Sequence, residues 1–140
     1  MNKNVYEDIK YDLAEIMIKN TDKNRSSNEF FDRSEESLLS MLIFYCKEVK
    51  KKHRLGVIVE VIFLLEDINN IEDFHNLFIN IDDESLKSVY TKSYYYATYV
   101  DYSEKSIGMT KEEAKEENGW LLNYFNATLS SLKQRLIDSF

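Results

Sequence analysis

Apolar side chains recur at three- and four-residue spacing along most of this 140-residue chain, which is the spacing of one face of an α-helix. Residues 20–28 are polar throughout and predict a loop. The chain has no Pro and only three Gly, so few residues interrupt helices or form tight turns. We therefore predict an all-α fold, a single-domain bundle of about six helices over residues 1–140. The expected helices cover residues 5–19, 28 or 29 to about 51, 55–68, 71–79, 85 to about 99, and 110 to about 137.

Residues 55–68 are the hardest segment to assign. Their Val, Ile and Phe side chains favour a β-strand, but the chain offers no partner strand and the length suits a helix. A helix that is apolar nearly all round is usually buried on every side. We therefore predict a central, buried helix at 55–68. We also expect Trp120 and Tyr124, on the last amphipathic helix, to pack into the core.

Three local signals mark where helices begin or weaken. The acidic residues 82–84 precede a predicted helix, and negative charge favours the positive end of the helix dipole. Thr110 and Glu113 have the three-residue spacing of a capping box, which predicts a helix start at this point. The pair Asn118-Gly119 marks a weak point in the last predicted helix.

The sequence offers few residues for catalysis or for binding a cofactor. No Gly-rich phosphate loop or nucleophile motif occurs, so we expect no enzymatic activity and no cofactor. His53, His75 and the single Cys46 do not have the spacing of a zinc site, and we expect no metal. No apolar run reaches the roughly 18 residues of a membrane-spanning helix, so we expect no membrane contact by this chain.

A cluster of basic residues follows the second predicted helix in an otherwise acidic chain with a net charge of −7. Positive charge near the end of a helix compensates its dipole, and this is the interpretation that the residues favour. The alternative is a patch that contacts phosphate groups or an acidic partner. The cluster consists of Lys47, Lys50, Lys51, Lys52, His53 and Arg54.

A group of tyrosines dominates the helix predicted at 85–99. So many aromatic side chains on successive turns cannot all face inward, and exposed tyrosine is enriched at protein interfaces. A core stripe with scattered surface tyrosines explains the pattern equally well. The candidate contact residues are Tyr95, Tyr96 and Tyr99.

Four segments, in order, resemble the all-alpha domain of type IV coupling proteins, the TraG/TraD-like ATPases of conjugation. The most specific is residues 28–45, in which Phe30-Phe31, Ser34-Glu35 and Leu38-Leu39 match the family pattern. Shorter segments that resemble the same domain lie at residues 55–62, 73–78 and 128–140. Residues from about 99 to 120 look like an insertion relative to the usual form, so no role is carried over to them.

In that family the all-alpha domain is inserted into a RecA-like motor, which is membrane-anchored and works as a hexamer. The domain faces the cytoplasm and contacts the relaxase, the relaxosome or secreted protein substrates. The resemblance therefore implies that this chain is a cytoplasmic domain cut from such an ATPase. It also implies a role in substrate recognition for conjugative DNA transfer, with the catalytic motifs on the rest of the parent protein.

Two other hypotheses stay open. The first is direct DNA contact by the same kind of domain through the basic residues 47–54, which would weaken steeply with salt. The second is a free-standing regulatory helical protein of a mobile element. An open reading frame that continues on both sides, with a phosphate loop upstream, would favour the excised domain.

Overall fold

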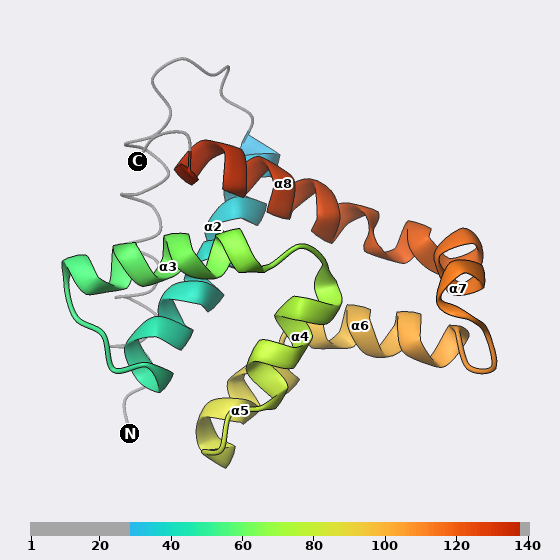
Figure 1. Ribbon diagram of the computed structural model, residues 1–140, viewed down its shortest axis with the longest axis horizontal. Helices are drawn as coiled ribbons and strands as arrows, with labels where there is room; N and C mark the ends of the chain where they lie inside the picture. Colours follow the sequence, from blue (N-terminus) through green and yellow to red (C-terminus); the bar gives the residue numbers. More distant parts are fainter. Residues whose placement is uncertain (1–28, 138–140) are drawn as a thin grey trace. The chain divides into compact units, whose positions relative to one another are not determined.

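The computed structural model describes residues 29–137, and within this range the chain forms helices and no strand (Figure 1). This confirms the predicted all-α fold. The helix predicted at 5–19 and the loop predicted at 20–28 lie outside the described residues. The elements are α2 (Glu29–Phe44), the π-helix η1 (Tyr45–Val49), α3 (Leu55–Asp67), α4 (Ile71–Ile79), α5 (Glu84–Thr91), α6 (Tyr94–Lys105), α7 (Lys111–Asn118), the 3₁₀-helix η2 (Gly119–Leu122) and α8 (Asn123–Ile137).

These elements fall into two compact units. Unit 1 holds α2, η1, α3 and the part of α8 from Thr128 onward. Unit 2 runs from Ile68 to Ala127 and holds α4 to η2 with the first turn of α8. That the two units fold as one domain stays a prediction. Across the described residues, no helix combines the length and the apolar character needed to cross a bilayer.

Unit 1 has an aliphatic core. Helix α2 packs against α3 and η1, and α3 also contacts η1. Burial of these branched side chains supplies the main stabilising free energy, about 1.5–3 kcal/mol for each one fully removed from water. The fully buried residues are Leu38, Leu39, Leu42, Ile43, Val57, Val61, Leu65, Leu132 and Leu136.

Unit 2 has an aromatic core. Phe74 on α4 lies at its centre, with ring centroids 4.8 Å from Phe78 and 5.4 Å from Phe125. Tyr95 on α6 packs edge-on against Phe74 at 5.2 Å and against Phe125 at 6.0 Å. Tilted and edge-to-face pairs of this kind add to the free energy gained from burial alone. The helix α4 agrees with the prediction for residues 71–79 and is capped by Asn70, which accepts from the Asp73 N–H.

The helix predicted at 85–99 is divided into α5 and α6. The division falls at Ser93, whose Oγ accepts a hydrogen bond from the Tyr96 N–H and donates one to the Tyr90 carbonyl. A serine that caps a new helix start competes with continuation of the preceding helix. Asp83 caps α5 by accepting from Ser85 and Leu86, as its acidic sequence predicted. Helix α6 then continues to Lys105, beyond the end predicted near residue 99.

The last predicted helix starts as expected and then breaks. Thr110 and Glu113 form the predicted capping box, each accepting the other's backbone N–H at 3.1 Å. The chain leaves the α-helix at Asn118 and passes through η2 before α8 begins. Because this break changes the helical phase, Trp120 points away from the core. The prediction that Trp120 and Tyr124 pack inside is therefore wrong.

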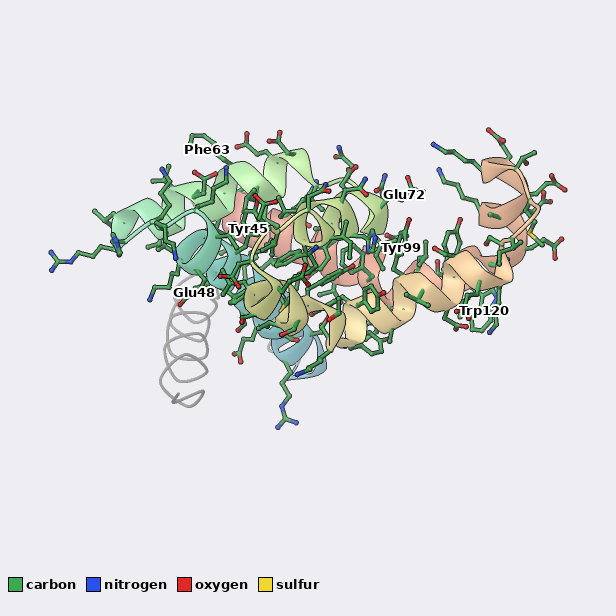
Figure 2. All side chains as sticks on the ribbon, turned by 90° about the horizontal axis from the view of Figure 1, so that it is seen from below. Tyr45, Glu48, Phe63, Glu72, Tyr99 and Trp120 are labelled. Carbon is green, nitrogen blue, oxygen red and sulfur yellow. The ribbon has the colours of Figure 1, made fainter. Side chains whose placement is uncertain are left out.

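Helix α3 is confirmed, but it is not buried on every side. One face is inside unit 1 and carries Val57, Val61 and Leu65. The opposite face carries Leu55, Val59 and Phe63, which are all exposed. Phe63 is labelled in Figure 2. The apolar character of the whole segment gave no indication of which side is exposed.

Candidate functional site

Most of the basic cluster lies in the loop that follows the π-helix η1. Helix α2 changes to the π-helix η1 at Tyr45, and the chain leaves η1 after Val49. Lys51 and Arg54 have φ angles of 56° and 54°, in the left-handed region, and they turn the chain from η1 into α3. Lys47 lies on η1 and is half-buried, whereas all the side chains from Lys50 to Arg54 are exposed. The interpretation as dipole compensation therefore fits only the η1 side of the loop.

This loop also precedes the N-terminus of α3, where positive charge is unfavourable for the dipole. Lys52 is partly compensated by Glu60, with Nζ 4.0 Å from Oε1. The first turn of α3 carries no acidic residue. The loop, defined here as Lys50–Arg54 and called the basic loop below, is therefore a concentrated positive charge on an otherwise acidic chain.

The structure separates Tyr95 from the other two candidate tyrosines. Tyr95 is buried in the core of unit 2, so its prediction as a contact residue is wrong. Tyr96 and Tyr99 are half-buried and both stack on His75 of α4, with centroid distances of 6.0 and 4.0 Å. Tyr94, which was not among the candidate contact residues, is exposed.

His75 is held in place by polar and aromatic contacts within unit 2. Its Nδ1 lies 2.7 Å from the hydroxyl of Tyr90, which is fully buried. Burial lowers the pKa of His75, and the nearby Glu72 carboxylate opposes this effect. Burial also raises the pKa of Tyr90, with smaller contributions from Tyr99 and Tyr96. The neutral imidazole is therefore the favoured form of His75. These contacts give His75 a packing role in unit 2.

Three exposed aromatic side chains lie on α6, η2 and the start of α8. Tyr94 is 61%, Trp120 64% and Tyr124 39% exposed. Tyr94 packs edge-on against Tyr124 at 6.2 Å, and Lys105 Nζ lies 5.9 Å from the Trp120 ring. Trp120 is labelled in Figure 2. Helix α6 packs against η2, the element that carries Trp120. We call Tyr94, Trp120 and Tyr124 the aromatic strip.

The surroundings of the aromatic strip are apolar and acidic. Ile107 and Met109, in the turn after α6, are exposed, and Asn118 Nδ2 holds this turn by donating to the Lys105 carbonyl at 3.1 Å. The next helix, α7, exposes four carboxylates, at Glu112, Glu113, Glu116 and Glu117. Unit 2 as a whole has eleven Asp and Glu against five Lys and no Arg, so it carries most of the chain's net negative charge.

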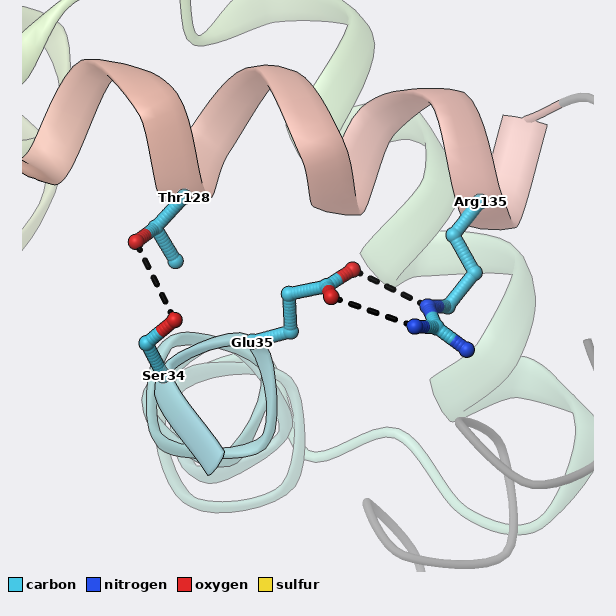
Figure 3. A network of polar contacts seen from close by, with 4 residues as sticks. All are labelled: Ser34, Glu35, Thr128 and Arg135. Carbon is cyan, nitrogen blue, oxygen red and sulfur yellow. Dashed lines mark hydrogen bonds and ion pairs between the residues drawn. The ribbon is translucent and has the colours of Figure 1, made fainter. Parts of the chain in front are cut away.

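Two segments of the family resemblance meet in unit 1. Glu35 on α2 is fully buried and accepts from Nε and Nη2 of Arg135 on α8, at 2.9 and 3.2 Å (Figure 3). Beside this pair, Thr128 Oγ1 donates to Ser34 Oγ at 3.3 Å (Figure 3). A bidentate Arg–carboxylate pair is directional, so it fixes how α2 and α8 align. The pair was not predicted, although both residues stood inside the quoted segments.

The described residues contain no group of three or more His, Cys, Asp and Glu that could hold a metal ion. Cys46 on η1 is buried, and burial together with the Glu60 charge raises the pKa of its thiol to about 12. A thiol with such a pKa is a poor nucleophile at neutral pH, so Cys46 has a packing role.

No family model, curated protein or solved structure matches this chain. The surfaces described above therefore have to be interpreted from their own chemistry. Two of them stand out: the aromatic strip on unit 2 and the basic loop on unit 1. The first was missed although the sequence marked Asn118-Gly119 as a weak point, because a weak point does not indicate which way the side chains beyond it face.

Proposed function

We propose that this chain is a protein-docking domain of a type IV coupling protein, with no catalytic activity of its own. It binds relaxase, relaxosome or secreted protein substrates on the cytoplasmic side of a membrane-anchored parent. The observation that carries the docking role is the aromatic strip. Exposed Trp and Tyr supported by packed neighbours are the side chains most enriched at binding hot spots.

The charge around the aromatic strip limits which kinds of protein segment could bind there. The carboxylates of α7 and the net negative charge of unit 2 would attract a basic segment and repel an acidic one. The partner is therefore a protein that presents a basic, partly apolar segment. Such a segment would place its apolar side chains on Trp120 and Ile107 and its cations near the carboxylates of α7.

The assignment to a coupling protein is supported by the ordered resemblance of four segments. The Glu35–Arg135 pair adds to this support because it joins a residue of the first segment to a residue of the last. Both residues lie at positions at which the family pattern has the same residue type. A chance resemblance of two short segments would not be expected to supply both halves of one buried ion pair.

The docking proposal is tested by titrating the chain with its cognate relaxase and following Trp120 fluorescence. Trp120→Ala should weaken binding roughly thirtyfold, because truncating a Trp at a hot spot costs about 2 kcal/mol or more. For the variant, binding is followed by calorimetry, since the fluorophore is lost. Phe63→Ala, an exposed aromatic of unit 1, is the matched control and should bind like the wild type. Wild-type affinity in Trp120→Ala, or no binding at tens of micromolar, would contradict the proposal.

A second candidate function, DNA contact, is favoured by the continuous exposure of the basic loop. In a gel-shift series, Lys51→Glu with Arg54→Glu should abolish binding, and wild-type binding should weaken steeply with salt. Lys111→Glu with Lys115→Glu makes the same charge change on α7 and serves as the control. Absence of a complex at low salt would remove this candidate.

A further inference from the structure

The outer face of α3 is apolar at its centre. Leu55, Val59 and Phe63 are 75%, 50% and 56% exposed. They recur every four residues, so they form one stripe along the helix. The contiguous apolar surface of three large side chains on a water-facing helix is unusual without a partner. We call these three residues the α3 stripe.

The two ends of this face carry opposite charges. The basic loop precedes Leu55, and Glu66, which is exposed, lies on the same helical face one turn beyond Phe63. Along the helix axis, Glu66 lies about 10 Å from Val59, at a rise of about 1.5 Å per residue. Val59 therefore lies about midway between the two charged ends. Along the chain, this face is therefore first basic, then apolar and then acidic.

We propose that the α3 stripe is a self-association surface that binds the α3 stripe of a second copy of this chain. A two-fold contact requires a surface that is complementary to itself. When two α3 helices lie antiparallel across Val59, Leu55 of one copy meets Phe63 of the other. The basic loop of each copy then lies beside Glu66 of its partner, so both charged ends are matched.

The charges favour a second copy over other partners. The Glu66 carboxylate would repel DNA at this face. The apolar side chains of the stripe would not bind phosphate groups, because phosphate contacts need cations. Unit 1 has thirteen Lys and Arg against fourteen Asp and Glu, so two copies meeting through it repel each other little. Association through unit 2, with its excess of carboxylates, would bring like charges together.

One helix face for each copy buries less than the roughly 800 Å² per partner of a standard interface. The dimer should therefore be weak and concentration-dependent. Sedimentation equilibrium of the full chain from about 10 µM to about 1 mM should show the mass rising from 16.6 kDa toward twice that value. Val59→Glu and Phe63→Glu should each stay monomeric over the whole range, while circular dichroism shows wild-type helix content.

A charge exchange tests the antiparallel arrangement. Lys51→Glu with Lys52→Glu should dimerise at least tenfold more weakly, and so should Glu66→Lys, since each places like charges opposite each other. An equimolar mixture of these two variants should recover the wild-type dissociation constant, because the changed ends match again. Glu116→Lys, an exposed charge reversal on α7, is the control and should dimerise like the wild type.

Three results would overturn the proposal. A wild-type chain that is monomeric up to 1 mM would show that another part of the chain or another partner covers the stripe. Dimerisation retained in Val59→Glu would place the contact elsewhere. Failure of the mixture to recover association would exclude the antiparallel pairing. Trp120→Ala should leave the dimer unchanged, so failure of this proposal and failure of the docking role are distinguishable.

Discussion

The two units of this chain are stabilised in different ways. Unit 1 has an aliphatic core and joins α2 to α8 through Glu35 and Arg135, which are 100 positions apart. Unit 2 has an aromatic core, and its polar contacts are mostly short in sequence, as at Ser93 and Thr110. The comparison indicates that unit 1 should depend strongly on one long-range pair. Unit 2 should instead tolerate the loss of any single polar contact better.

The largest expected effect comes from breaking the buried ion pair of unit 1. Glu35→Met should lower the free energy of unfolding by about 3–5 kcal/mol, because Arg135 would remain buried without its carboxylate. Chemical denaturation followed by circular dichroism measures the loss. The double variant Glu35→Met with Arg135→Met should recover most of it, since neither charge then remains. A cost below about 1 kcal/mol for Glu35→Met would contradict the dependence of unit 1 on this pair.

In unit 2, His75→Phe should destabilise the chain by about 1–3 kcal/mol. Phe keeps the stacking on Tyr99 but leaves the buried Tyr90 hydroxyl without its 2.7 Å partner. Thermal or urea unfolding measures the change. Tyr90→Phe in the same background should cost little more, because the unpaired hydroxyl is then gone. Equal additive losses from the two substitutions would show that the hydrogen bond contributes little.

His75 should also make unit 2 sensitive to acid. Burial lowers its pKa in the folded chain below the unfolded value of about 6.5. A lowered His pKa means that its contribution is fully present above the unfolded pKa and is lost as pH falls through the folded pKa. Stability should therefore fall on acidification below about pH 6.5. His75→Phe should flatten this part of the pH profile, and an unchanged profile would show that other groups dominate.

A smaller effect is expected at the helix caps of unit 2. Ser93→Ala should cost about 1 kcal/mol, since the α6 N-terminus loses the acceptor for the Tyr96 N–H. Thr110→Ala should cost a similar amount at α7. Ser130→Ala, at an exposed position inside α8, is the matched control and should change stability by no more than about 0.5 kcal/mol. If Ser130→Ala lowered the stability as much as Ser93→Ala, the caps would make no special contribution to stability.

The smallest effect, with no expected change in stability, concerns Cys46. Its buried thiol, with a pKa of about 12, should not react with a thiol-specific reagent at pH 7 until unit 1 unfolds. The labelling rate should rise with denaturant in parallel with the unfolding of unit 1. Rapid labelling of the native chain would show that η1 opens locally.

Local features of the fold could be predicted from the sequence. Helix α4 and the capping box of α7 depend on residues within a few positions of each other, and both were predicted. The division at Ser93 was missed because the tyrosine pattern continues across it, whereas a single side-chain cap decides where a helix starts.

The candidate surfaces were harder to predict. The exposure of Trp120 follows from the η2 break, and the exposure of the α3 stripe depends on which side of the helix lacks a neighbour. Periodicity reports that a face is apolar and does not report what covers it. The Glu35–Arg135 pair needs tertiary proximity between residues 100 positions apart, which no local pattern contains.

The insertion of unit 2 between the two parts of unit 1 sets an order of events during synthesis. At about 5–20 residues per second, Arg135 is made roughly 5–20 s after Glu35. Unit 2 is continuous in sequence and can fold during this interval, because all its contacts are already available. The side of α2 that packs against α8 must wait until Arg135 and the leucines of α8 are made. Premature termination before residue 128 would therefore leave a chain in which unit 2 is complete and unit 1 is a target for chaperones and proteases.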